Sequence, residues 1–306
     1  MLIDTHAHVN FKAFEQDGEE VIKRALEQGV WIVNVGTQID TSRQAVELAE
    51  KFNHPSLNPS PSEGREGAGG GVYAVIGLHP VHTYSQHVDE EENSFQTRKE
   101  NFDYDAYHQL AQNSKVVGIG ECGLDYFRLP AETQHGTWNM EQIKQQQKEV
   151  FIAQIKLAKE VNKALVIHCR PSVGSQDAYE DILQILDREF ENFQFPISNF
   201  QFEIHSFTGT PEIAQEFLKR GAYVGLNGII TFDKTGNMQK VVETVPLERI
   251  VLETDSPYLT PAPHRGKRNE PLYVKHVAEK IAGIKQVSLE EVGNQTTLSA
   301  KKLFNI

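Results

Sequence analysis

Two histidines, His6 and His8, follow the apolar start of the chain with one residue between them. Imidazoles at this spacing could bind a metal ion. Side chains alternate between the two faces of a β-strand, so a strand here points both imidazoles the same way. Two imidazoles on one face at the end of a strand are half of a metal site. The plain alternative is a buried polar pair that only makes hydrogen bonds.

The same arrangement recurs further along the chain. Four more apolar runs end in a histidine or an acid, namely at Glu121, His168, His205 and Asp255. Three or four such ligands hold one divalent ion. Six, with one carboxylate that bridges, are enough for two, and ions about 3.5–4 Å apart are the usual arrangement for hydrolysing phosphate esters or amides. Mixed imidazole and carboxylate ligands suit Zn, Mn, Fe or Co and tolerate Mg, so the ligand types leave the metal open.

Three further residues are expected to contact substrate. Arg170 lies beside His168, and a guanidinium holds planar oxyanions in a bidentate fork. Arg265 belongs to the most basic local cluster of the chain, residues 264–271, in a loop position where barrels often bind phosphate. His79 precedes Pro80 at the end of another apolar run. The alternatives are a surface salt bridge for Arg170, a solvated loop for Arg265 and an ordinary loop histidine for His79.

The elements that must position these residues alternate between strand and helix along the chain. Strands are predicted at 2–9, 31–36, 72–77, 116–120, 164–167, 200–204, 223–226 and 250–254. Helices are predicted at 18–29, 41–52, 102–112, 138–161, 178–190, 211–220, 238–244, 273–281 and 289–303. The strands are continuous apolar runs, which is typical of a parallel sheet covered on both faces.

This pattern predicts an α/β fold, and a (β/α)8 TIM barrel is its most economical form. A doubly wound open sheet is the alternative. The polar residues follow the first, fourth, fifth, sixth and eighth strands, and only a closed barrel brings the ends of all five to one mouth.

Composition narrows the class of protein further. The 306 residues carry a net charge of −12, which argues against a broad basic surface for long duplex nucleic acid but not against a metal-centred phosphate site. Cys122 and Cys169 end apolar runs and are read as reduced and buried. No apolar run approaches the length of a membrane span, and the first residues do not resemble a signal peptide. We therefore expect one cytoplasmic domain, 1–306, with a flexible Pro/Ser/Gly-rich insertion at 54–71.

Several motifs together resemble the TatD family of metal-dependent deoxyribonucleases. They are Asp4–His8, Gly77–Pro80, Gly118–Tyr126, Ile167–Arg170, His205–Gly209, Glu253–Leu259 and Arg265–Pro271, in order and across nearly the whole chain. The insertion at 54–71 departs from the family pattern. So does Pro171, because the family commonly continues with an acid after the motif that ends at Arg170.

The resemblance implies a TIM-barrel hydrolase in which two divalent ions are bound by His6, His8, Glu121, His168, His205 and Asp255. The family implies Mg or Mn as the metal, and the types of ligand also allow Zn. Glu121 would bridge the ions, and Asp255 would orient or deprotonate the attacking water. The implied activity is 3′-to-5′ exonuclease cleavage of DNA phosphodiesters.

Three functions remain open from the sequence. The first is a two-metal phosphodiesterase that acts on single-stranded DNA ends, with no membrane and no obligate protein partner. The second is a metal-dependent hydrolase of a small ester or amide, or of D-aminoacyl-tRNA, that uses the same ligands and suits an acidic chain. The third is a non-catalytic metal protein. Six convergent ligands argue against it, because packing alone does not require them.

Overall fold

The computed structural model describes most of the chain. The described residues are 1–52, 71–84, 87–90, 93–96, 99–130, 139–190 and 200–306. The insertion predicted at 54–71 falls outside them except for its last residue. The prediction of a single domain over 1–306 stays a prediction.

Eight parallel strands form one sheet, and all eight lie where the sequence predicts strands. In spatial order they are β1 (Leu2–Ala7), β2 (Val30–Val35), β3 (Val72–Ile76), β6 (Val116–Asp125), β7 (Ala164–Arg170), β8 (Phe202–Ile204), β9 (Tyr223–Leu226) and β10 (Ile250–Leu252). The first and last strands meet where Ala7 pairs with Ser256 and the Asp255 amide donates to the His6 carbonyl at 2.9 Å. The sheet is therefore a nearly closed barrel, which confirms the (β/α)8 prediction over the open sheet.

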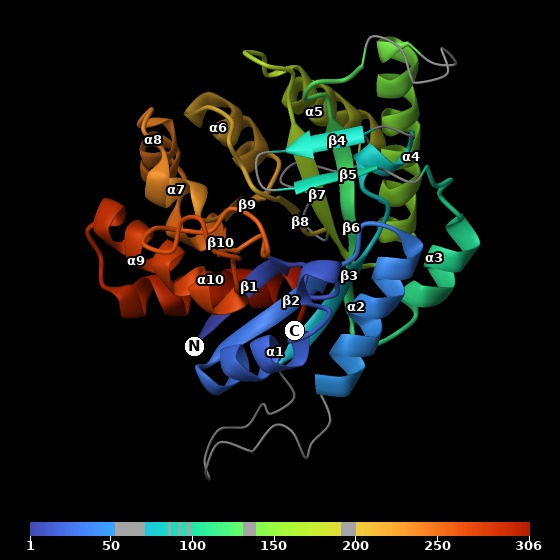
Figure 1. Ribbon diagram of the computed structural model, residues 1–306. Coiled ribbons are helices and arrows are strands. Elements are labelled where there is room, and N and C mark those ends of the chain that lie inside the picture. Colours follow the sequence, from blue (N-terminus) through green and yellow to red (C-terminus); the bar gives the residue numbers. More distant parts are fainter. Residues whose placement is uncertain (53–70, 85–86, 91–92, 97–98, 131–138, 191–199) are drawn as a thin grey trace.

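Helices lie between the strands and around the outside of the barrel (Figure 1). They are α1 (Gly18–Glu27), α2 (Ile39–Phe52), α3 (Tyr104–Ala111), α4 (Met140–Glu160), α5 (Asp177–Glu189), α6 (Pro211–Lys219), α7 (Ile229–Phe232), α8 (Asn237–Thr244), α9 (Val274–Lys285) and α10 (Leu289–Phe304). Single 3-10 turns occur at Lys12–Phe14, Pro80–His82, Leu247–Arg249 and Pro271–Tyr273. Side-chain caps fix where some helices begin. Asn139 and Gln142 form a capping box at the start of α4, and Thr210 caps α6 directly before Pro211.

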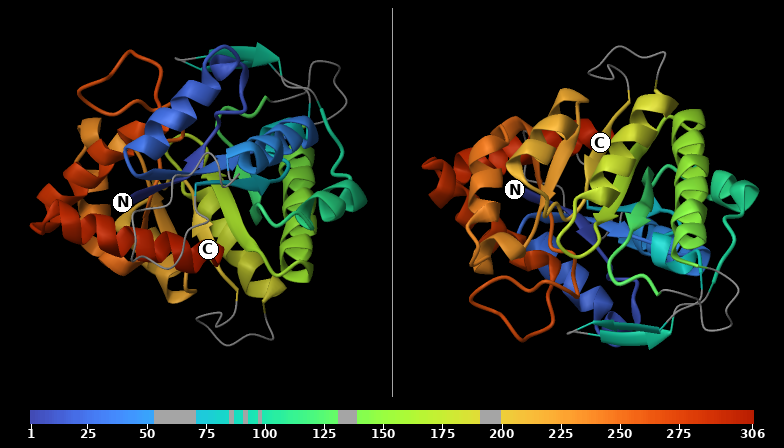
Figure 2. Two further views of the ribbon diagram at one scale, coloured as in Figure 1. Left: turned by 90° about the horizontal axis from the view of Figure 1, so that it is seen from below. Right: turned by 90° about the horizontal axis from the view of Figure 1, so that it is seen from above.

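The hydrophobic core has two layers. The larger layer lies between the strands and the surrounding helices. The smaller layer takes alternate positions on the strands, including Val33, Val75, Val166 and Val251, and packs against Phe304 of α10. Figure 2 shows α10, in red, crossing beneath the strands. Because α10 closes the amino-terminal end of the barrel, the carboxyl ends of the strands form the open mouth.

Two elements were not expected from the sequence. A hairpin of β4 (His87–Glu90) and β5 (Asn93–Gln96) forms a separate antiparallel sheet, and α7 is a single helical turn. The hairpin strands are mostly polar and short, so hydrophobic periodicity does not mark them. β6 also runs to Asp125, well past the predicted end at 120, and therefore contains Glu121.

Glycines make the extension of β6 possible. The pairing of β6 with β7 shifts in register between Ile119 and Cys122, which is where Glu121 sits. Gly123 has a φ of +141°, and a Cβ there would lie 2.0 Å from the carbonyl oxygen of His168. Only a residue without a side chain fits this close approach between β6 and β7.

Replacing Gly123 with alanine should therefore destabilise the barrel. We expect the free energy of unfolding to fall by about 2–6 kcal/mol, the sum of backbone strain and overpacking at 1–3 kcal/mol each. Gly174 is a matched control, because it also has a positive φ (+75°) but a Cβ there meets nothing within 4 Å. Gly174→Ala should cost only about 1–2 kcal/mol in the same urea titration. Equal losses in the two variants would contradict the packing argument.

Candidate metal centre

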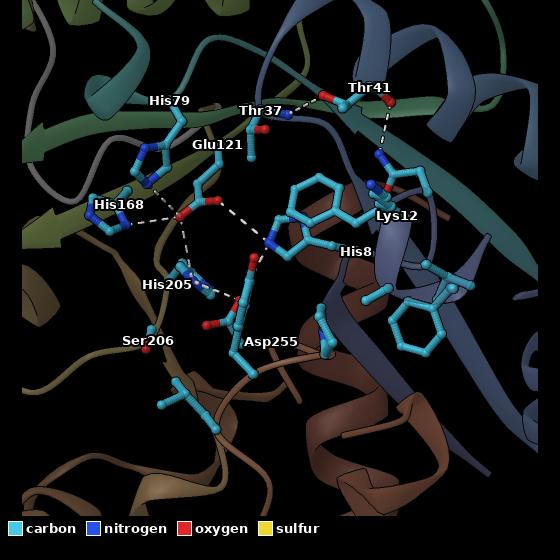
Figure 3. A pocket seen from close by; sticks show the side chains of 18 of the residues that line it. His8, Lys12, Thr37, Thr41, His79, Glu121, His168, His205, Ser206 and Asp255 are labelled. Carbon is cyan, nitrogen blue, oxygen red and sulfur yellow. Dashed lines mark hydrogen bonds and ion pairs between the residues drawn. The ribbon is translucent and has the colours of Figure 1, made fainter. Parts of the chain in front are cut away.

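A pocket of about 1840 Å³ opens at the mouth of the barrel. All of the predicted site residues line it except His6, which is fully buried beneath it. Figure 3 shows His79, His168, His205, His8 and Asp255 around Glu121. His168 lies in β7, and the other four follow the ends of β3, β8, β1 and β10. The fold therefore brings together side chains that lie up to about 250 positions apart in the sequence.

Glu121 is the centre of this cluster, and its two carboxylate oxygens face different histidines. Oε2 lies 3.4 Å from His6 Nε2 and 3.7 Å from His8 Nε2. Oε1 lies 2.9 Å from His168 Nδ1, 3.4 Å from His79 Nε2 and 3.6 Å from His205 Nε2. A carboxylate in this position can contribute one oxygen to each of two neighbouring cations.

His6, His8 and Asp255 form one group of ligand atoms beside Glu121 Oε2. The Nε2 atoms of the two histidines are 3.2 Å apart, and His8 Nε2 lies 3.4 Å from Asp255 Oδ1. The other ring nitrogen of His8 lies 2.9 Å from the carbonyl oxygen of Val35. A carbonyl only accepts, so His8 Nδ1 carries the proton and Nε2 presents a lone pair to the cluster.

His168 and His205 are oriented by two acids that sequence reasoning did not single out. His168 Nε2 lies 3.0 Å from Asp125 Oδ2, and His205 Nδ1 lies 2.9 Å from Glu253 Oε2. In both cases the outer nitrogen is taken by a carboxylate and the inner nitrogen faces Glu121. Carboxylates in this role fix the tautomer and the ring orientation of metal-binding histidines. The signal in the sequence is that both acids lie within the motifs that carry Glu121 and Asp255.

The acids and histidines of the cluster shift one another's pKa values. Burial by itself raises the pKa of Glu121, but His79, His6 and His168 outweigh it and hold the pKa well below its usual value. Burial lowers the pKa of His6 to about 3. His168 and His205 are buried too, but hydrogen bonds and charges from neighbouring carboxylates raise their pKa values to about 9 and about 10. Glu121 is therefore an ionised carboxylate at the centre of the cluster.

Asp255 sits at the edge of the cluster, where it also reaches the pocket. Its side chain is 15% exposed, whereas that of Glu121 is 5% exposed. Its backbone φ is +57°, a left-handed conformation that aspartate tolerates better than most residues. Burial raises the pKa of Asp255, but the hydrogen bond with His8 and the charge of His205 outweigh it and lower the pKa overall. Asp255 is thus an ionised carboxylate with access to small molecules in the pocket.

Two arginines at the pocket stack on aromatic rings. The guanidinium carbon of Arg170 lies 3.9 Å from the ring centre of Phe127, and that of Arg265 lies 3.9 Å from the ring centre of Phe232. Both arginines and both rings line the pocket. Arg268 of the same basic cluster instead forms an ion pair with Asp17 at 2.6 Å and does not line the pocket. Only part of the predicted basic cluster therefore faces the site.

The donor set of this centre fits divalent cations. Imidazole nitrogens and carboxylate oxygens are the ligands of Zn and Mn sites, and they converge here from five strands or strand ends. A third group of ligand atoms, from His79, Asp125 and His168, also lies within 4.8 Å of one another. Because His168 Nε2 is hydrogen-bonded to Asp125, we interpret that group as support for His168 rather than as a separate ion site.

Comparisons with known proteins find relatives that match over the whole chain. The family model described as TatD related DNase matches residues 3–305. The uncharacterized metal-dependent hydrolase YabD of Bacillus subtilis is 39% identical over 100% of both chains. The 3′-5′ ssDNA/RNA exonuclease TatD of Escherichia fergusonii is 29% identical over 100% of this chain and 99% of its own. The crystal structure of YjjV, a TatD homologue from Escherichia coli, superposes with a TM-score of 0.75 at 24% identity, covering 100% of this chain and 98% of that one.

None of the helices within the described ranges is both long and apolar enough to cross a bilayer.

Proposed function

This chain belongs to the TatD-related DNase family of metal-dependent hydrolases, and from that premise we propose that it removes nucleotides from the 3′ ends of single-stranded DNA. The observation that carries the proposal is the convergence of two ligand groups on the two oxygens of Glu121, at the bottom of a pocket lined by Arg170 and Arg265. That geometry suits a pair of ions acting on a phosphodiester.

We assign the ligands to two ions on the basis of their grouping. His6, His8 and Asp255 with Glu121 Oε2 would hold one ion. His168 and His205, which both approach Glu121 Oε1, would hold the other. Mg or Mn are the proposed native metals, and the four imidazoles also suit Zn. When bound, the two ions would polarise the scissile phosphate and lower the pKa of water in the pocket.

The residues of the chain have separate roles in this proposal. Asp255, ionised and open to the pocket, accepts the proton of the attacking water. Arg170 and Arg265 bind phosphate oxygens, because a guanidinium donates two parallel hydrogen bonds to an oxyanion. His79 lies 3.4 Å from Glu121 and lines the pocket, so it can donate to the same phosphate. Phe127 and Phe232 offer faces on which unpaired bases stack.

The shape and charge of the pocket favour a strand end over a duplex. A strand terminus enters a concave mouth without bending a helix, and unpaired bases are free to stack on aromatic rings. Four glutamates also line the pocket on the side of α1 and α2, at Glu15, Glu19, Glu20 and Glu47. A long phosphate backbone would be repelled there. We therefore expect contact with only the last few nucleotides of a strand.

The proposal also covers the cellular compartment and the partners of the protein. We propose the cytoplasm as its compartment, because Cys122 and Cys169 are both free and buried. DNA ends are the proposed partner, and the activity is expected to need no second protein.

The decisive experiment for the substrate class compares linear and circular single-stranded DNA of one sequence in Mg or Mn. We expect the linear strand to be degraded and the circle to stay intact. The same preparations are offered p-nitrophenyl acetate and D-aminoacyl-tRNA. Hydrolysis of either one without digestion of linear DNA would overturn the nuclease proposal. It would show that the metal centre hydrolyses carboxylic esters instead.

Arg170 is expected to act on substrate rather than on metal. Arg170→Ala removes a guanidinium that stacks on Phe127 at the pocket and is not among the metal ligands that we assign. We expect KM for single-stranded DNA to rise by about 10-fold or more, since hydrogen bonds to charged groups contribute about 1.5–3 kcal/mol. Metal content, measured by inductively coupled plasma mass spectrometry, should equal that of the wild type. A large loss of metal would show that Arg170 supports the centre instead.

A further inference from the structure

Two histidines outside the pocket, His264 and His276, face each other on the surface. We propose that His264 and His276 form a separate surface site for a borderline divalent ion such as Zn²⁺. His264 lies in the loop after β10, and His276 lies on α9. Neither residue belongs to the cluster around Glu121, so the site is independent of the proposed nuclease centre.

The facing nitrogens of the pair are spaced as in a chelate. His264 Nε2 and His276 Nε2 lie 3.2 Å apart. Two imidazole nitrogens that each bind a tetrahedral zinc at about 2.0–2.1 Å are themselves about 3.3–3.4 Å apart. An imidazole–imidazole hydrogen bond gives a similar distance, so the surroundings of the two rings have to decide between them.

Those surroundings hold both rings in the metal-binding orientation. His276 Nδ1 lies 2.8 Å from Glu279 Oε2, so Nδ1 carries the proton and Nε2 is left as a lone pair facing His264. A carboxylate behind an imidazole is the usual support of a metal-binding histidine. The His264 ring stacks on Tyr273 with 4.3 Å between ring centres and 5° between planes, which fixes the second ligand.

The position is open enough for an ion to enter with its water. The side chain of His276 is 15% exposed, and His264 is also partly exposed. Burial, the neighbouring His276 and the charges of Lys267 and Lys275 lower the pKa of His264. The same lysines repel a cation, so we expect binding weaker than in a four-ligand structural zinc site. An ion here would tie the loop that carries Arg265 to α9.

Zinc binding by the full-length protein tests this site. The protein is dialysed to equilibrium against graded Zn²⁺, and bound zinc is counted by mass spectrometry in the wild type, His264→Gln and His276→Gln. We expect each variant to bind one zinc fewer than the wild type, with its circular dichroism spectrum unchanged. His108→Gln is the matched control, because His108 is 39% exposed and lies 3.4 Å from the acid Glu160 but has no imidazole partner in the described structure. The same zinc count in all four proteins would overturn the proposal.

Glu279→Gln separates a metal site from a plain hydrogen bond. This variant keeps both imidazoles but loses the carboxylate behind His276. A metal site predicts that zinc affinity at this position falls by about 10–100-fold, as for other supporting carboxylates. Unchanged zinc affinity at this position would mean that the two histidines only bond to each other.

Discussion

Replacing Asp255 by asparagine is expected to lower kcat for nucleotide removal by about 10²–10⁴-fold, the usual contribution of a general base. Asparagine keeps the size of the side chain and tolerates the left-handed backbone at this position. It cannot accept a proton from water, however, and it contributes no negative charge toward His8 and His205. Single-turnover rates on a 5′-labelled single strand, measured in saturating Mn, isolate this effect from weaker metal binding.

Asp40→Asn is the matched control for this prediction. Asp40 is 56% exposed and does not line the pocket, so its replacement should leave the rate unchanged. Melting temperatures of the two variants should show that both are folded. If the rate of Asp255→Asn stays within threefold of the wild type, Asp255 is not the general base. It could then act only as a metal ligand.

The second large effect is expected at Glu121. Glu121→Gln removes the carboxylate whose two oxygens each face a different ligand group, so occupancy should fall at both ion positions. We expect the loss of affinity to exceed the roughly 10–100-fold that losing a supporting contact costs, and activity to fall with it. Metal content after dialysis against micromolar Mn²⁺ measures this directly, by mass spectrometry on the protein and on its dialysis buffer.

Glu160→Gln gives the comparison for Glu121. Glu160 also faces a histidine, His108 at 3.4 Å, but its side chain is 55% exposed and lies outside the pocket. This variant should keep its full metal content and activity. Retention of one ion by Glu121→Gln would show that Glu121 belongs to one position only and that the bridging assignment is wrong.

Sequence reasoning could predict that these side chains meet because the fold obeys a simple rule. Parallel strands of a barrel end at one mouth, so polar residues that follow apolar runs must meet there. His6, His168 and His205 are far apart in sequence, but all three approach Glu121 within 3.6 Å in the structure. The alternation of strands and helices was enough to establish this placement, since it fixes which ends of the strands coincide.

The same reasoning could not find the residues that act through others. Asp125 lies within an unusually long strand whose extension depends on glycines, and strand-end logic does not anticipate its contact with His168. Glu253 is fully buried two positions before Asp255, where a charged residue carries no periodic signal. The basic cluster at 264–271 shows the opposite limit, because composition alone cannot tell Arg265, which faces the pocket, from Arg268, which pairs with Asp17.

The account is tested most directly by the pattern of products from a 5′-labelled linear single strand, followed over time with the wild type in Mn²⁺. We predict a ladder in which the labelled strand shortens one nucleotide at a time from its 3′ end, and which disappears in EDTA and with Asp255→Asn. Immediate release of the label as a mononucleotide would contradict the assigned polarity. A full-length strand at every time point, with metal bound to the protein, would contradict the nuclease assignment itself.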